Sequence, residues 1–239
     1  MKKLIIIIYI TVFSVSCSSE NENVISTNFT LKHIVTEKSS EESIVYTQEY
    51  IMDNDGKVVQ EKFQSMLYPN QSSTSTFEYD NEGKVVKEVR NKKLVYSVVW
   101  NDNIATVKDL DANLTFTCIF QNGKLLQYSL TGNSYKFNYD QNDNVISQEN
   151  NGEIFVEFLN YDTSVSNPMY LIKSIGILRM ASNPYFKNFF QTKKAYPFED
   201  IDFSVPLTYY TYQKMVGVDN RITKITNNEN TYTSKFEYN

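Results

Sequence analysis

Few side chains in this sequence have the types and spacing that catalysis requires. His33 is the only histidine, and no Ser-His-Asp or Cys-His pattern surrounds it. A histidine-based metal centre lacks ligands for the same reason. Paired acids stand at Glu41-Glu42 and at Glu199-Asp200-Asp202, a pattern that suits acid–base hydrolysis or a solvated acidic surface. The sequence therefore predicts no enzyme and no cofactor, and hydrolysis of an extracellular polymer by acidic residues is the alternative.

Calcium is the metal that the sequence fits best. Asp53, Asp55, Asp140 and Asp143 place oxygen ligands on short turns, which is where hard cations bind. No bidentate acid follows at the spacing of a helix-loop-helix calcium site, and Asp, Asn and Gly are also the residues that tight turns need. We therefore expect a structural role for these four acids and no metal, with calcium as the competing interpretation.

Cys17 ends a segment with the composition of an export signal. Lys2 and Lys3 give a basic start, residues 4–15 carry no charge, and small residues precede the cysteine. The apolar run is shorter than the ~20 residues that span a bilayer. The segment resembles a bacterial lipoprotein signal, which implies cleavage before Cys17 and a diacylglyceryl thioether on its sulfur. Ordinary cleavage, with Cys17 a simple thiol, is the alternative.

The residues after Cys17 are polar and acidic and predict a flexible tether over 17–27. Ser18, in place of aspartate, resembles the pattern for retention in the outer membrane. Glu20 and Glu22 resemble surface-export signals of lipoproteins from Bacteroidota, or they belong to a solvated linker. We expect a lipid-anchored outer-membrane protein, facing either the periplasm or the exterior.

The charge of the chain excludes one class of partner. The net charge is −5, and loss of Lys2 and Lys3 with the signal takes the mature chain to −7. A nucleic-acid-binding protein needs a basic surface that displaces counterions, so we expect no nucleic-acid partner. Cys118 alternates with aromatic residues, which predicts a small buried apolar side chain and not a reactive thiol.

A repeated unit organises the chain after the tether. Each copy has an aromatic-rich alternating run, an Asp or Asn turn, and a pair of aliphatic residues, most clearly at 50–59 and 77–86. Turn residues at 80, 101, 121 and 140 are 21, 20 and 19 residues apart, which fits one hairpin per unit. Asn122-Gly123 suits a type I′ turn, because both central positions of that turn need φ > 0.

The strands of these units have one apolar face. Period-two alternation predicts an antiparallel sheet that is buried on one side and wet on the other. The wet side carries Glu78, Lys87 and Lys136, which argues against a transmembrane barrel. The residues expected to share the buried side are Tyr96, Val98, Trp100, Phe116, Cys118, Phe120, Tyr135, Phe137 and Tyr139.

One stretch interrupts the hairpins. Pro168 can open a helix, and Leu171, Ile175 and Leu178 have helical spacing, so we expect one or two short helices over 168–191 covering the core of the sheet. Asn239 stands at a turn position without a return strand, so either the chain is truncated or its last strand is an unpaired edge. The expected divisions are a signal at 1–16, the tether at 17–27, and a β domain at 28–239 with an insertion at 162–208.

The aromatic-Asp-x-x-Gly-x-aliphatic units resemble the tyrosine-aspartate repeats of secreted bacterial proteins. The mature chain resembles Bacteroidota lipoproteins of unknown function that carry such hairpins in one curled, porin-like sheet. Their turn followed by Asn-Pro-aromatic matches Tyr161-Asp162 with Asn167-Pro168-Met169-Tyr170, although Met169 replaces the aromatic residue. The resemblance implies an all-β fold, which we expect to be a single antiparallel meander curled into a half-barrel. It implies no activity.

We expect a non-enzymatic binding or interaction module on the cell envelope. The 18 tyrosines and 15 phenylalanines allow rings to stand exposed at sheet edges, where they could hold a glycan, a peptide or a protein, or they fill the core. Besides the hydrolase, a structural or protective lipoprotein, for example one that guards against a toxin, is an alternative. The ligand-binding residues cannot be named from the sequence.

Overall fold

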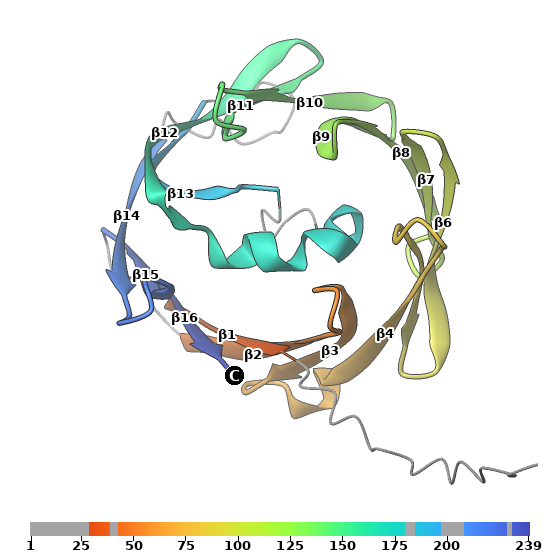
Figure 1. The fold of residues 1–239 in the computed structure, drawn as a ribbon, viewed down its shortest axis with the longest axis horizontal. Helices are drawn as coiled ribbons and strands as arrows, with labels where there is room; N and C mark the ends of the chain where they lie inside the picture. Colours follow the sequence, from red (N-terminus) through yellow and green to blue (C-terminus); the bar gives the residue numbers. More distant parts are fainter. Residues whose placement is uncertain (1–28, 39–42, 180–184, 197–207, 229–230) are drawn as a thin grey trace, which may run out of the picture.

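The computed structural model describes residues 29–38, 43–179, 185–196, 208–228 and 231–239, and these residues form a closed barrel of sixteen antiparallel strands (Figure 1). Two short 3₁₀ helices, η1 and η2, accompany the strands. The elements are β1 Phe29–Lys38, β2 Ser43–Met52, β3 Val58–Ser65, η1 Pro69–Gln71, β4 Ser73–Tyr79, β5 Val85–Arg90, β6 Lys93–Asn101, β7 Ile104–Asp109, β8 Leu114–Gln121, β9 Lys124–Leu130, β10 Asn133–Tyr139, β11 Val145–Asn150, β12 Glu153–Ser166, η2 Pro168–Leu178, β13 Asn188–Ala195, β14 Thr208–Val216, β15 Ile222–Asn227 and β16 Tyr232–Tyr238.

The barrel closes between the first and last strands. β1 pairs with β2 on one side and with β16 on the other, and Lys32 lies opposite Glu237. The Thr30 N–H donates to the Asn239 carbonyl at 2.8 Å, and the Asn239 N–H donates back at 3.0 Å. The predicted half-barrel is therefore wrong, although the antiparallel order along the chain holds. An unpaired edge at the last strand is also wrong, because closure gives β16 a partner on each side.

The predicted turn chemistry is observed at one end of the barrel, which we call the repeat end. This end holds the turns 53–57, 80–84 and 140–144, together with the start of β1 and the end of β16. Asp80 Oδ1 accepts the N–H groups of Glu82 and Lys84, both at 2.9 Å, and Gly83 takes a φ of +77°. A side chain that accepts two turn N–H groups explains why aspartate begins the turns at 53, 80 and 140.

The aromatic residues before the turns 80–84 and 140–144 each form a hydrogen bond to the preceding hairpin. The Tyr79 hydroxyl donates to the Val58 carbonyl at 2.6 Å, and Tyr139 donates likewise to Leu125 at 2.7 Å. The lysine of the preceding turn often lies over the same ring, as Lys57 does over Tyr79 at 5.8 Å. The equivalent bonds are Trp100 to Val85, Tyr161 to Val145 and Tyr238 to Ile222. The repeat therefore encodes contacts between successive hairpins as well as the hairpins themselves.

Removing one of these hydroxyl groups should destabilise the barrel measurably. Tyr139→Phe leaves the Leu125 carbonyl without its side-chain donor and should lower the free energy of unfolding by about 1–2 kcal/mol. Tyr135→Phe is the matched control, because Tyr135 is on the same strand and its hydroxyl has no hydrogen-bond partner within the described residues. Urea denaturation of the two variants measures the difference. Equal losses would contradict the proposed role of the repeat tyrosines.

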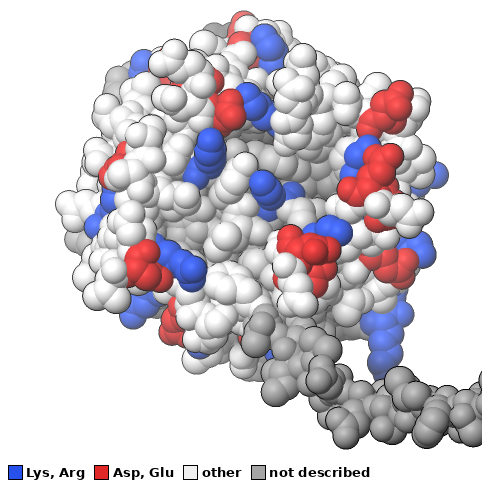
Figure 2. Space-filling model, in the orientation of Figure 1, with Lys and Arg blue, Asp and Glu red and all other residues white. Residues whose placement is uncertain are grey.

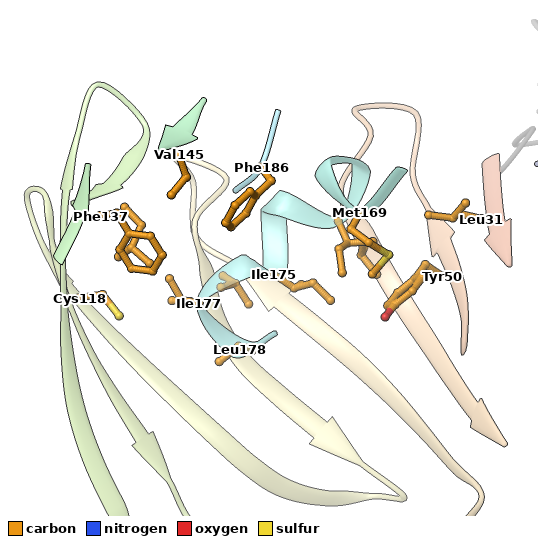
Figure 3. Packing of buried hydrophobic residues seen from close by; sticks show 14 of the residues in the cluster. Leu31, Tyr50, Cys118, Phe137, Val145, Met169, Ile175, Ile177, Leu178 and Phe186 are labelled. Atoms are coloured by element: carbon orange, nitrogen blue, oxygen red, sulfur yellow. The ribbon is translucent and has the colours of Figure 1, made fainter. Parts of the chain in front are cut away.

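The helix η2 crosses the interior of the barrel and does not cover the outside of a sheet (Figure 1). Asn167 caps its start by accepting the Met169 N–H at 3.0 Å, and Pro168 occupies the first turn, as predicted. Figure 3 shows Ile175 and Ile177 between one wall that carries Leu31 and Tyr50 and another that carries Cys118 and Phe137. The helix therefore fills the lumen with apolar side chains.

The helical stretch is shorter than predicted. The helix ends at Leu178, residues 180–184 lie outside the described part, and β13 occupies 188–195 as a strand of the wall. Leu171 is exposed, whereas Ile172, Ile175 and Leu178 are buried. The predicted face was wrong at Leu171 because the stretch is of the 3₁₀ type, in which residues three apart align, and because it is kinked at Ile175, whose φ and ψ are not helical. Gly176 is needed where it lies, since a Cβ there would be 2.6 Å from the Tyr185 ring.

The outer wall carries opposite charges on neighbouring strands. Glu78 and Lys87 lie 2.8 Å apart across β4 and β5, and Figure 2 shows acidic side chains beside basic ones around the ring. Further pairs are Lys32–Glu237, Lys62–Glu49, Lys136–Glu149 and Lys194–Glu157. A lipid-facing wall needs an apolar band, where one lysine at mid-height costs about 2–4 kcal/mol. The outward face of these strands is therefore suited to water.

No helix within the described residues is long and apolar enough to cross a membrane.

Candidate functional site

The lumen changes character on the side of η2 away from the repeat end. Along β1 the inward residues are Leu31, His33, Val35 and then Glu37, and along β2 they run from Tyr50 to Gln48. The apolar filling thus gives way to polar groups toward the opposite end of the barrel, which we call the cavity end. Here the described part of the barrel encloses a cavity of about 650 Å³. It is lined by His33, Glu37, Tyr46, Gln48, Asn167, Met169, Phe189, Phe190, Lys193, Tyr212, Ile225, Asn227, Thr231, Tyr232, Ser234 and Phe236.

Aromatic rings form much of this cavity wall. Phe190 meets Tyr212 edge to face, with ring centroids 5.6 Å apart. His33 stacks on Phe236 across β1 and β16, with centroids 4.7 Å apart and planes 6° apart. Asn167 and Met169, at the start of η2, form part of the lining. The helix therefore both fills one half of the lumen and limits the depth of the cavity in the other half.

His33 has a partner that the sequence analysis missed. Its Nε2 lies 3.0 Å from the Ser234 hydroxyl, which donates in turn to the Tyr232 hydroxyl at 2.7 Å. Burial lowers the pKa of His33 to about 4, and the neighbouring Gln48 amide opposes this only in part. His33 Nδ1 is buried and has no hydrogen-bond partner within the described residues. The imidazole is therefore neutral at pH 7 and forms part of the cavity wall.

The His33–Ser234 pair lacks the properties of a hydrolytic centre. An effective general base at neutral pH has a pKa near 7, well above that of His33. The residue opposite His33 on β2 is Gln48, an amide where a triad would place a carboxylate. Ser234 is buried and its hydroxyl is engaged with Tyr232. The arrangement can accept and donate hydrogen bonds, which suits binding.

A second group of polar residues lies at the end of η2. Arg179 is 12% exposed, and its Nε and Nη1 donate to Glu61 on β3 and Glu88 on β5, each at 2.9 Å. Ser75 and Arg90 also donate to Glu88, at 2.8 Å. Burial opposes ionisation of Glu88, but Arg179, Ser75 and Arg90 together outweigh this and lower the pKa of the carboxyl. Arg179 therefore fastens the helix to two strands of the wall through the side chains of Glu61 and Glu88.

The four calcium candidates serve the turns or pair with lysines. Asp53 and Asp140 each accept two backbone N–H groups of their own turns, at 2.8–3.0 Å. Asp55 lies 3.7 Å from the Lys57 ammonium group, and Asp143 forms an ion pair with Lys124. The structure does not bring the four together, and the described residues contain no group of three or more His, Cys, Asp or Glu side chains that could hold a metal.

Cys118 is fully buried on β8, as predicted, and burial raises the pKa of its thiol to about 12. The thiol is therefore uncharged and unreactive at neutral pH. Other candidates from the sequence fall outside the described residues. These are Cys17 with its signal and tether, Glu41, Glu42, Glu199, Asp200 and Asp202.

The molecule is thus a closed, antiparallel sixteen-stranded barrel with an internal helix and a cavity at one end. No protein-family model matches the chain, and the search of curated proteins finds no match. Similar solved structures include a porin-like protein from Bacteroides uniformis, with a TM-score of 0.44 and 10% sequence identity, over 88% of this chain and 97% of that one. Another is a porin-like protein from Bacteroides vulgatus, with a TM-score of 0.39 and 12% identity, over 86% and 97% of the two chains.

Proposed function

We propose that this protein is an envelope lipoprotein that binds a small ligand in the luminal cavity without transforming it. The observation that carries the proposal is the cavity of about 650 Å³, which lies within the ~300–1,000 Å³ of known ligand sites. Aromatic rings supply contact area there, and many polar groups, such as His33, Gln48 and Asn227, can supply hydrogen bonds. This mixture of aromatic and polar groups suits a polar ligand.

The position of the cavity fits an anchored protein. β1 begins at Phe29 at the repeat end, and Glu37, which lines the cavity and is exposed, lies eight residues further along the strand. At ~3.4 Å per residue this places the cavity end about 27 Å from the point where the chain enters the barrel. A lipid on Cys17 would thus be joined to the end of the barrel opposite the cavity.

Lipidation of Cys17 can be tested separately from binding. In the native host, intact-mass analysis should find a mature chain that begins at Cys17 and carries acyl groups, and Cys17→Ala should release the protein from the membrane fraction. A diacylglyceryl group carries two acyl chains, which together give stable anchoring to a membrane. Release of the variant that lacks this group should therefore be nearly complete. An unmodified mature N-terminus would contradict the anchor and leave the binding proposal standing.

Ligand binding can be tested on arrays of glycans and peptides with the protein carrying Cys17→Ala, followed by calorimetry of each hit. Ile225→Trp places a large ring in the cavity wall and should weaken binding at least tenfold. Thr226→Trp is the matched control, because the next residue of β15 points to the other face of the sheet. Equal binding by both variants, or retention of no compound at all, would contradict a luminal ligand site.

The same experiment decides between binding and the alternatives. A hydrolase would release products from a bound polymer, whereas the two buried carboxylates of the lumen, Glu61 and Glu88, are both held by Arg179. A purely structural or protective lipoprotein would retain nothing on the arrays. Retention without turnover is the expected result.

A further inference from the structure

A second cavity adjoins the first within the lumen. Its volume is about 550 Å³, and Gln48 lines both cavities. An aromatic pair also spans them, because Tyr46 lines the first, Phe63 lines the second, and their rings lie 5.8 Å apart. The residues of the second cavity are Gln48, Glu61, Phe63, Asn70, Gln71, Ser72, Ser73, Ser75, Arg90, Asn91, Tyr96, Leu178 and Arg179. The two cavities are therefore neighbouring parts of one polar surface along β1, β2 and β3.

The second cavity is rich in hydroxyl and amide groups, and its charges are already paired. Glu61 and Glu88 bind Arg179, and Arg90 binds Glu88. A charged ligand would have to compete with these ion pairs and would lose its own hydration. The wall therefore favours an uncharged ligand with many hydroxyl groups over an anion or a cation.

The rings and the polar groups are arranged along the same path. Tyr46 and Phe63 stand at the junction, Phe190 and Tyr212 at one end, and Tyr96 at the other. A sugar ring offers a C–H face that packs on an aromatic ring and hydroxyl groups around its edge that bond to amides and hydroxyls. A chain of such rings would use both kinds of contact in both cavities.

We propose that the two cavities are subsites of one groove that binds an extended, uncharged oligosaccharide, with Gln48 at the junction. This inference rests on the proposed function and adds the ligand's chemical class and length. His33 and Asn227 line the first subsite and offer polar groups to the hydroxyls of the ligand there. Phe63 and Tyr96 contact the ligand in the second.

The test is the dependence of affinity on chain length. Linear neutral oligosaccharides of glucose, mannose and xylose, each with one, two, four and six units, are titrated calorimetrically into the full mature chain with Cys17→Ala. At least one series should bind, and its affinity should rise tenfold or more between two and six units. Ser73→Trp, which fills the second cavity, should remove this gain and leave the binding of the shorter members unchanged.

Thr76→Trp is the matched control, because Thr76 lies on the same strand and is exposed on the outer face. Equal affinity at all lengths, or no effect of Ser73→Trp, would overturn the two-subsite groove while leaving the proposed function intact. Extended peptides that bind where none of the oligosaccharides does would overturn the ligand class. Failure of the proposed function itself would appear differently, as the loss of all selective binding on the arrays.

Discussion

Replacing Arg179 with methionine should lower the free energy of unfolding by about 3–5 kcal/mol. The substitution leaves Glu61 buried without a cation and leaves Glu88 with Arg90 as its cation, and buried charges that lose their partner carry penalties of this size. It also removes the link between η2 and strands β3 and β5. The loss is a large part of the stability of an ordinary domain, about 5–15 kcal/mol, and guanidinium denaturation at pH 7.5 measures it.

A triple variant separates the buried charge from the loss of the side chain. Arg179→Met combined with Glu61→Gln and Glu88→Gln removes all three charges and should recover much of the loss. Arg90→Met is a milder comparison, because Arg90 is about one-third exposed and Glu88 keeps Arg179 in that variant. A loss below about 1 kcal/mol in Arg179→Met would show that the cluster does not hold the helix to the wall.

Stability should also fall as the pH drops from 7.5, because of His33. Its pKa is about 4 in the folded chain and about 6.5 when unfolded, so the unfolded state binds the proton first. The stability that depends on a neutral His33 is fully present above pH 6.5 and is lost as the pH falls toward 4. A shift of this size corresponds to about 3 kcal/mol in total, of which about 2 kcal/mol is lost between pH 7.5 and pH 5.

His33→Gln is the control for this pH dependence. His33 is the only histidine in the sequence, so in the variant the slope between pH 7.5 and pH 5 should nearly disappear. Carboxyl groups with lowered pKa values, such as Asp162 at about 2, lose their contributions at lower pH and stay common to both proteins. Identical slopes in the two proteins would contradict a buried, neutral imidazole.

The local part of the fold could be predicted from the sequence. Asp80 accepts N–H groups of its own turn, and Gly83 takes the positive φ that the turn needs. Both effects are local, so these residue types are sufficient to predict the turn. Asn122 and Gly123 both take positive φ values, 51° and 74°, as a type I′ turn requires. The prediction of which residues face inward, such as Val98 and Cys118, is also confirmed. It depends only on the two-residue period of a strand.

Closure of the barrel could not be predicted in this way. The pairing of β1 with β16 joins the two ends of the domain, and no residue of Phe29–Lys38 or Tyr232–Tyr238 marks the other as its partner. The half-barrel was inferred from strand patterning and resemblance, which do not determine the number of strands or whether the ring is complete. The chain's last strand therefore looked unpaired, although it completes the barrel.

The candidate site depends on closure for the same reason. His33 and Ser234 are 201 residues apart in sequence and meet only across the β1–β16 pair. Arg179 follows the apolar stretch Ile175–Leu178 and reaches Glu61 and Glu88 only because that stretch lies inside the barrel. Glu88 and Arg90 lie on the inward side of β5, but their residue types could not name Arg179 as a partner.

The closed barrel creates the lumen and its cavity, and a cysteine pair across the closing strands tests this closure directly. With Cys17 replaced by Ala, Lys32→Cys and Glu237→Cys place two thiols on directly opposed residues, whose Cα atoms in an antiparallel pair lie ~4.5–5.5 Å apart. Oxidation of the native protein should form the disulfide nearly completely, and Cys118 is too deeply buried to interfere. Lys32→Cys with Lys87→Cys, on strands that are not neighbours, should stay reduced. Failure of the first pair to crosslink, as in a sheet open between β1 and β16, would contradict the closed barrel and the cavity that depends on it.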